Sequence, residues 1–233
     1  MRNFMLRDKI KTKNYFIGIK NDGIDWLENL REMRSIVIPN KLNAYYIDLD
    51  VTNTELFKAC YSLGDSINSI FEYFKEGLHY YSLSYTENDG IFTIIDHLSL
   101  AVLFENRKDE FIDDVKVLFD KYVQYSEQDE NVQDGYIETL ALYLLEGRVE
   151  NFRSHLEYLN MIGNNADSVI EAQKFWYYAH SEASWYDTHK TDDAYYGYWS
   201  FDTAALCKMR GIYDERFKDL DFFPYDLLVQ EDR

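Results

Sequence analysis

The chain lacks the residues and patterns that mark several classes of protein. Its 233 residues include only two cysteines, Cys60 and Cys207, which argues against a disulfide framework and favours buried free thiols in a reducing compartment. Apolar runs such as residues 98–104 are far shorter than the roughly 20 residues that a helix needs to cross a bilayer. The first 16 residues are basic, but no apolar segment follows them, so no secretory signal is expected. These absences predict a cytoplasmic protein that does not bind membranes.

Proline and glycine are also scarce. Two prolines and no run of alternating polar and apolar residues give no indication of β-strands. The ten glycines are scattered, so the glycine-rich loop that cradles a phosphate is missing. Cysteines and histidines do not occur at zinc-binding spacings. His180 and Glu182 match the H-x-E part of a deaminase motif, but its cysteine half is absent. We therefore expect no cofactor and no bound metal.

Positive charge is in short supply as well. Lysine and arginine number 24 against 42 aspartates and glutamates, a net charge of −18. Residues 1–20 carry a net charge of +5, so the rest of the chain carries −23. Such a body repels nucleic acid and anionic membranes, and it attracts a basic partner over about one Debye length. Acidity that serves solubility alone explains the composition equally well at this point.

What the chain does have is helical periodicity. Apolar residues at helical spacings recur along the chain, and six segments predict helices. Residues 91–104 are apolar on all sides, so we expect their helix to be central. We expect an all-α bundle of about eight or nine helices in two closely packed halves. The polar stretch 126–135 has no apolar stripe and predicts the boundary between a domain of residues 1–125 and one of residues 126–233. The six segments are residues 67–81, 91–104, 111–122, 137–145, 167–180 and 201–210.

Capping residues indicate where some of these helices begin and end. Asp65, and Asn88 or Asp89, precede two of the segments and are suitable N-cap residues. Gly147 and Gly211 follow two others, where a helix commonly ends in a left-handed glycine.

The loop that begins at residue 185 is the best candidate for a metal or acid–base site. It holds Asp187, His189, Asp192 and Asp193 within a few positions. A metal- or small-molecule-dependent enzyme that uses Asp187, His189 and Asp193 is therefore the alternative function that stays open. The competing interpretation is a solvated loop whose aspartates cap backbone amides.

Two other catalytic arrangements fit less well. A glycosidase-type carboxylate pair among Glu182, Asp187 and Asp202 needs a cleft, whereas the aromatic residues nearby look packed. Cys207 lies on an apolar helical segment without an activating base, as an inert buried thiol does.

Five aromatic residues crowd the segment 195–201. They can stack nucleic-acid bases only in a basic groove, and this part of the chain is acidic. A core in which Trp199 and Phe201 pack, while the tyrosine hydroxyls stay in contact with water, is the interpretation that we favour. The five are Tyr195, Tyr196, Tyr198, Trp199 and Phe201.

The C-terminal third carries a series of motifs, namely a W-Y pair, a polar loop, a G-Y-W-S-F-[ED]-x-A-A stretch, a G-I-x-D turn and a closing segment of the type Y-P-x-D-L. This series resembles the signature of the PoNi family, the immunity proteins for polymorphic nuclease effector (PoNe) toxins. Residues 6–16 and 60–67 resemble the family's N-terminal part more loosely. Asp202 stands where glutamate is commoner, and Phe223 where tyrosine is. The signature residues expected to maintain the structure are Trp185, Tyr186, Gly197, Tyr198, Trp199, Phe201, Asp202, Pro224 and Asp226.

The resemblance implies an all-α protein of two parts, without catalytic activity, that binds and blocks a cognate DNase toxin. Its partner would be that toxin rather than nucleic acid, and the protein would be a monomer or a homodimer. A DNA-mimic regulator without a toxin partner is a further alternative, which would bind basic proteins indiscriminately.

Two acidic loops are the candidate toxin-binding surface, because each concentrates negative charge on a segment expected to be exposed. Ordinary solvated loops are the competing interpretation. Tyr195 and Tyr196 are candidate aromatic anchors, since tyrosine is enriched at interfaces. The candidate acidic residues are Glu127, Asp129, Glu130 and Asp134 in one loop, and Asp187, Asp192 and Asp193 in the other.

Overall fold

The computed structural model describes residues 5–191 and 194–230. Over these residues the secondary structure is entirely helical, with ten α-helices joined by turns and short 3₁₀ helices. The all-α prediction is confirmed, and the helix count is slightly higher than predicted. None of the helices in this part of the chain is long and apolar enough to cross a membrane.

The chain divides into two compact units that are not continuous in sequence. Unit 1 contains residues up to Tyr85 together with Asp187–Tyr198, and unit 2 contains Thr86–Tyr186 together with Trp199–Gln230. The polypeptide therefore leaves unit 1, forms most of unit 2, returns to unit 1 for one segment and then completes unit 2. The proposed boundary at residue 126 stays a prediction.

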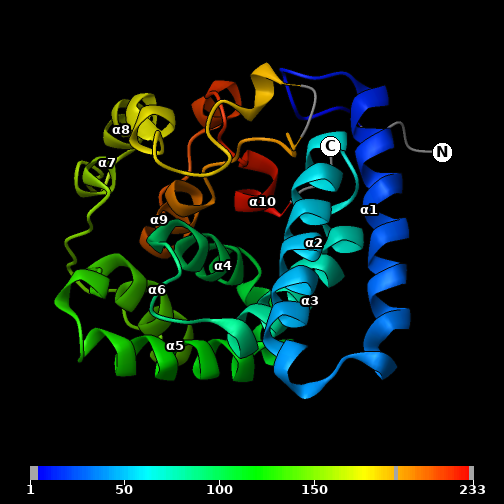
Figure 1. Ribbon diagram of the computed structural model, residues 1–233. Helices are drawn as coiled ribbons and strands as arrows, with labels where there is room; N and C mark the ends of the chain where they lie inside the picture. Colours follow the sequence, from blue (N-terminus) through cyan, green and yellow to red (C-terminus); the bar gives the residue numbers. More distant parts are fainter. Residues whose placement is uncertain (1–4, 192–193, 231–233) are drawn as a thin grey trace. The chain divides into compact units, whose positions relative to one another are not determined.

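Unit 1 is built on three helices, α1 (Lys13–Met33), α2 (Leu42–Leu63) and α3 (Ile67–Ser84), coloured blue to cyan in Figure 1. Helix α2 packs against both α1 and α3. Because α2 has neighbours on two sides, its buried residues extend around most of the helix rather than along one stripe. That is why residues 42–63 show no helical stripe in the sequence.

The core between α1 and α2 consists of large side chains from both helices. At Gly23 the two helices approach so closely that a Cβ atom would lie 2.8 Å from the side chain of Leu56. A larger residue there requires the side chain of Leu56 to shift. The core residues are Leu27, Leu30, Tyr45, Leu49 and Leu56.

The junction between α2 and α3 turns at Gly64, whose φ of +96° lies in the region that favours glycine. A Cβ atom there would also lie 2.2 Å from the carbonyl oxygen of Met5, so the N-terminal segment crosses directly over this turn. Ser66, and not Asp65 as expected, is the N-cap of α3, and its hydroxyl accepts the amide of Ser69. Asp65 instead forms an ion pair with Lys20, at 2.6 Å.

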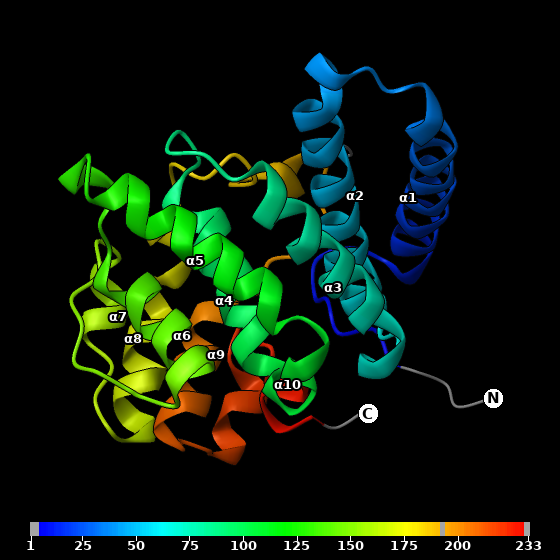
Figure 2. The same ribbon diagram turned by 90° about the horizontal axis from the view of Figure 1, so that it is seen from below.

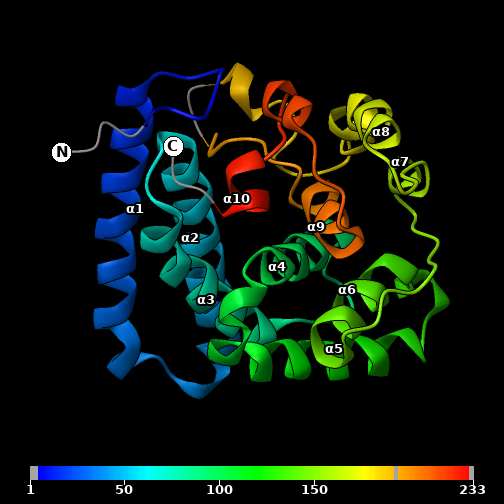
Figure 3. The same cartoon turned by 180° about the vertical axis from the view of Figure 1, so that it is seen from behind.

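Unit 2 is centred on α4 (Ile91–Leu103), which packs against α6 (Gly135–Glu146) and α9 (Phe201–Arg210). Helix α5 (Ile112–Ser126) packs on α6, while α8 (Ala166–Ala179) and α10 (Tyr225–Val229) pack on α9 and α7 (Glu157–Asn160) packs on α8. Figures 2 and 3 show these helices from two further directions. Most residues of α4 and α9 are buried, as expected of helices with neighbours on several sides.

The caps of the unit 2 helices agree with the sequence prediction at two C-terminal ends and differ from it at one N-terminal end. Gly147 and Gly211 have φ of +68° and +66° and end α6 and α9 as predicted. The expectation for α4 is wrong, because its N-cap is Gly90. Asp89 closes the preceding turn instead, by accepting the amide of Thr86 at 3.1 Å.

Candidate functional site

The first candidate acidic loop follows the end of α5. Glu127, Asp129 and Glu130 are all exposed. The turn that carries them is shaped by backbone bonds to the last turn of α5, since the amides of Glu127 and Asp129 donate to the carbonyls of Val123 and Tyr125. These three residues, the acidic turn, place their side chains in solvent where a partner can reach them.

Asp134 is buried, unlike the three residues of the acidic turn and contrary to the expectation that it is exposed. It is 2% exposed and is the N-cap of α6, where it accepts the amide of Tyr136 at 2.8 Å. Its second oxygen accepts the hydroxyl of Ser154 at 2.9 Å and the amide of His155 at 2.8 Å. The expectation of an exposed carboxylate is therefore corrected: the first helical amides have no intrahelical acceptor, and Asp134 supplies one.

The second candidate loop contains Asp187 and His189. Asp187 has a φ of +63° and pairs with Lys190 at 2.6 Å. The hydroxyl of Tyr198 lies 3.1 Å from Nδ1 of His189 and accepts its backbone amide at 3.0 Å. Asp192 and Asp193 lie outside the described residues. Among the described residues, no three histidine, cysteine, aspartate or glutamate side chains are grouped so that they could hold a metal ion.

Tyr195 is buried within unit 1, contrary to the expectation of an exposed anchor. Its side chain is 0% exposed, and its hydroxyl donates to Asp8 Oδ2 at 2.5 Å. The other oxygen of Asp8 accepts the amides of Ile10 and Lys11, each at 2.7 Å. Burial, followed by the bond to Asp8, raises the pKa of Tyr195 well above its usual value, which keeps the hydroxyl protonated as a donor. No pattern in the sequence indicated a role for Asp8.

Further bonds tie the same segment to the N-terminal helices. The hydroxyl of Tyr15 donates to the carbonyl of Tyr195, and the hydroxyl of Ser62 donates to the carbonyl of Tyr196, both at 3.0 Å. Tyr196 is half-buried, and the pKa of its hydroxyl is raised by burial and by the nearby carboxylate of Glu55. The segment 194–198 is therefore built into unit 1 by contacts from residues more than a hundred positions away.

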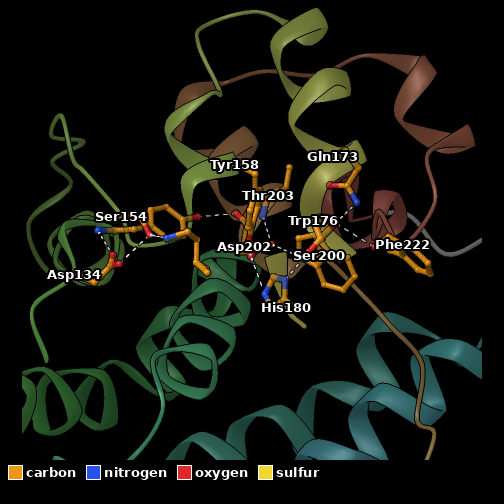
Figure 4. A network of polar contacts seen from close by, with 12 residues as sticks. Asp134, Ser154, Tyr158, Gln173, Trp176, His180, Ser200, Asp202, Thr203 and Phe222 are labelled. Atoms are coloured by element: carbon orange, nitrogen blue, oxygen red, sulfur yellow. Dashed lines mark hydrogen bonds and ion pairs between the residues drawn. The ribbon is translucent and has the colours of Figure 1, made fainter. Parts of the chain in front are cut away.

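Asp202 is the centre of a buried polar network in unit 2, drawn in Figure 4. Its carboxylate accepts the hydroxyl of Tyr158, the indole N–H of Trp176 at 3.1 Å and the amide of Thr203 at 2.6 Å. Asp202 is 2% exposed, and burial raises the pKa of its carboxyl above the usual range. The hydroxyl of Tyr136 donates to the backbone carbonyl of Asp202 at 2.6 Å. Asp202 therefore accepts hydrogen bonds from four donors, three at its carboxylate and one at its carbonyl.

His180 belongs to this network and not to a deaminase-like site. Its Nδ1 lies 2.7 Å from the carbonyl of Trp176, and because a carbonyl only accepts, Nδ1 carries a proton. Its Nε2 lies 3.9 Å from Asp202 Oδ2. Glu182 is exposed, so the two acids considered as a catalytic pair in this unit lie in unlike environments.

The two thiols are buried and free. Burial raises the pKa of both Cys60 and Cys207 to about 12, so neither forms a nucleophilic thiolate at neutral pH.

The signature residues are largely interior. Three are half-buried, namely Trp185, Tyr186 and Trp199, and the others are buried. The signature is split between the units, since Gly197 and Tyr198 belong to unit 1, whereas Trp185, Tyr186 and the residues from Trp199 onward belong to unit 2. The buried members are Gly197, Tyr198, Phe201, Asp202, Pro224 and Asp226.

Comparison with known families gives two matches. Residues 6–115 match the family model described as PoNe immunity protein (PoNi), N-terminal, and residues 150–227 match PoNe immunity proteins (PoNi), C-terminal. No curated protein and no solved structure matches the chain. The acidic turn lies between the two matched regions.

Proposed function

Because this chain belongs to the family of PoNe immunity proteins, we propose that it binds a cognate PoNe-type DNase and inhibits it, protecting the cell that makes both. The family membership is the observation that carries this proposal. The protein acts as an inhibitor rather than as an enzyme, in the cytoplasm where the DNA to be protected lies, as a monomer or a homodimer.

Charge supports an acidic binding surface for this task. The net charge of −18 repels DNA, whereas a nuclease that holds a polyanion presents cationic groups. Complementary charge speeds the encounter of two such proteins, toward roughly 10⁸ M⁻¹s⁻¹ or more at low salt. The exposed candidates in unit 2 are the three residues of the acidic turn, Glu127, Asp129 and Glu130. Asp187 is the acidic candidate described in unit 1.

The test is to purify this protein with the nuclease domain encoded beside it and to assay DNA cleavage by the mixture. A stable complex without cleavage supports the proposal. Undiminished cleavage at a saturating excess of the protein would overturn it. The metal-dependent alternative is tested by a thermal-shift screen against divalent cations, because a bound ligand raises the stability by about 2.7 kcal/mol at a hundredfold excess over its dissociation constant.

The role of the acidic turn needs a matched pair of variants. Glu127→Lys with Glu130→Lys changes the charge by the same amount as Glu182→Lys with Asp219→Lys, and all four residues are exposed in unit 2. A slower association in the first variant but not in the second locates the acidic turn in the binding surface. Equal association rates of the two double variants would show that the acidic turn is not part of the binding surface.

A further inference from the structure

The solvent-facing side of α1 carries apolar side chains that a soluble helix ordinarily buries. Trp26 is 50% exposed and Met33 is 37% exposed, and Ile36, in the turn after the helix, is 75% exposed. The core of unit 1 uses Leu27 and Leu30, on another side of the same helix. Exposed apolar groups that gather on one face mark interaction sites, whereas scattered ones do not.

These apolar residues form one continuous stripe with three acids. The exposed positions follow each other at spacings of three and four, the period of a helix face. The stripe covers 15 residues, or roughly 22 Å at 1.5 Å per residue, which suits one helix laid across a partner. We call it the Trp26 face, and its members are Asp22, Asp25, Trp26, Asn29, Glu32, Met33 and Ile36.

The negative charge of the Trp26 face is not neutralised by the helix's own basic residues. Lys20 pairs with Asp65 and Arg31 pairs with Glu76, each at 2.6 Å, so these cations serve contacts within unit 1. Asp22, Asp25 and Glu32 make neither an ion pair nor a side-chain hydrogen bond with any residue in the ranges 5–191 and 194–230. The face therefore offers an indole and a thioether beside three uncompensated carboxylates.

That combination identifies the occupant. A second copy of this chain would bring the same carboxylates against each other, and like charges at an interface disfavour association. An anionic membrane is repelled in the same way. A basic protein surface satisfies both parts of the face, by ion pairs to the acids and by an apolar pocket for Trp26. Tryptophan is among the residues that most often dominate a protein–protein interface.

We propose that the Trp26 face binds the cationic surface of the nuclease that this protein inhibits, with Trp26 as the principal anchor. This assignment rests on the proposed function and adds to it the helix that engages the toxin. The acids steer the encounter and the indole sets the lifetime of the complex, because rim charges act mainly on association and buried anchors on dissociation.

The test compares Trp26→Ala with Phe175→Ala, since Phe175 on α8 is equally exposed, at 51%. Binding of each purified full-length variant to the cognate nuclease domain is measured by biolayer interferometry, with circular dichroism melts to verify folding. We expect Trp26→Ala to weaken binding about tenfold or more through faster dissociation, and Phe175→Ala to leave it unchanged. The triple variant Asp22→Lys, Asp25→Lys, Glu32→Lys is expected to slow association and to reduce its dependence on salt.

The outcomes separate this assignment from the proposed function. If the wild-type protein binds and inhibits the nuclease while Trp26→Ala does so equally well, the Trp26 face is not the anchor and the proposed function stands. If the wild-type protein does not bind the nuclease, both fall. A concentration-dependent dimer in sedimentation, dissociated by Trp26→Ala, would assign the face to a second copy instead and overturn the assignment to a nuclease.

Discussion

Residues 126–135 and 187–196 look alike in the sequence and differ in the structure. Both are polar, rich in aspartate and without an apolar stripe. The first keeps the acidic turn exposed to solvent, and of its acidic residues Asp134 is the buried one. In the second, Tyr195 is buried against Asp8, which lies 187 positions earlier. The comparison teaches that distant partners, and not local polarity, decide whether such a segment is free to bind another protein.

The largest expected loss of stability comes from a substitution that detaches the second segment, residues 187–196, from Asp8. Asp8→Ala leaves the hydroxyl of Tyr195 and the amides of Ile10 and Lys11 without their acceptor. Each buried donor left unpaired costs about 1–3 kcal/mol, so we expect a loss of about 3 kcal/mol in the free energy of unfolding, measured with urea.

Asp8→Asn is the control for that change, because its amide oxygen retains an acceptor, and it should cost less. A loss below about 0.5 kcal/mol in Asp8→Ala, the level of an ordinary surface substitution, would mean that the attachment contributes little.

A somewhat smaller effect is expected inside the first segment, where Asp134 is buried and the three residues of the acidic turn are exposed. Asp134→Ala removes the N-cap of α6 and the acceptor for Ser154 and His155. We expect a loss of about 2 kcal/mol, since an N-cap alone contributes about 1 kcal/mol. Asp129→Ala in the exposed turn should change the stability by less than about 0.5 kcal/mol. Equal losses in the two variants would contradict the contrast drawn within this loop.

A finer test uses the thiols as reporters of the two units. Tyr195→Phe removes the hydroxyl bound to Asp8 but keeps the ring, and we expect it to cost about 1 kcal/mol. Cys60 lies in unit 1 and Cys207 in unit 2. Loosening the attachment should therefore speed the reaction of Cys60 with a thiol reagent severalfold and leave Cys207 unaffected, as mass spectrometry of the labelled peptides will show. Parallel acceleration of both thiols would point to global unfolding instead.

The smallest expected effect concerns the buried carboxylate of unit 2, Asp202, and its dependence on pH. Burial raises the pKa of Asp202 above its ordinary 3.8, so the folded state holds that proton more tightly than the unfolded state. The resulting stabilisation is complete below pH 3.8 and is lost as the pH rises through the folded value. The melting temperature of the wild type minus that of Asp202→Asn should therefore increase from pH 7 to pH 4. A constant difference would show that Asp202 does not titrate in this window.

The sequence predicts six of the longer helices, among them the largely buried α4 and α9, and misses α1 and α2. The stripe from Ile67 to Tyr81 is buried as expected, and Gly147 ends α6. Helix α2 was not predicted because its buried residues include polar ones. Asn53 is an example, since its side-chain amide donates to the carbonyl of Leu49 at 2.8 Å. Its two neighbours erase the one-sided pattern on which the prediction depends.

The candidate site was predictable only in part, for the same reason. Composition indicates that Glu127, Asp129 and Glu130 are polar and exposed, which the structure bears out. It contains no information on pairs such as Asp8 and Tyr195, because that contact joins the two ends of the chain. Trp26 was not identified because it lies on α1, outside the six segments that the sequence predicts to be helical.

The return of residues 187–198 to unit 1 also has a consequence for synthesis of the protein. The ribosome releases α1, α2 and α3 early, but the segment that completes their unit emerges roughly 110 residues later, on the order of ten seconds at ordinary translation rates. Until then Asp8 lacks the hydroxyl of Tyr195, and Ser62 lacks the carbonyl of Tyr196. A nascent chain that stops before residue 198 therefore carries an unfinished first unit, however complete its first three helices are.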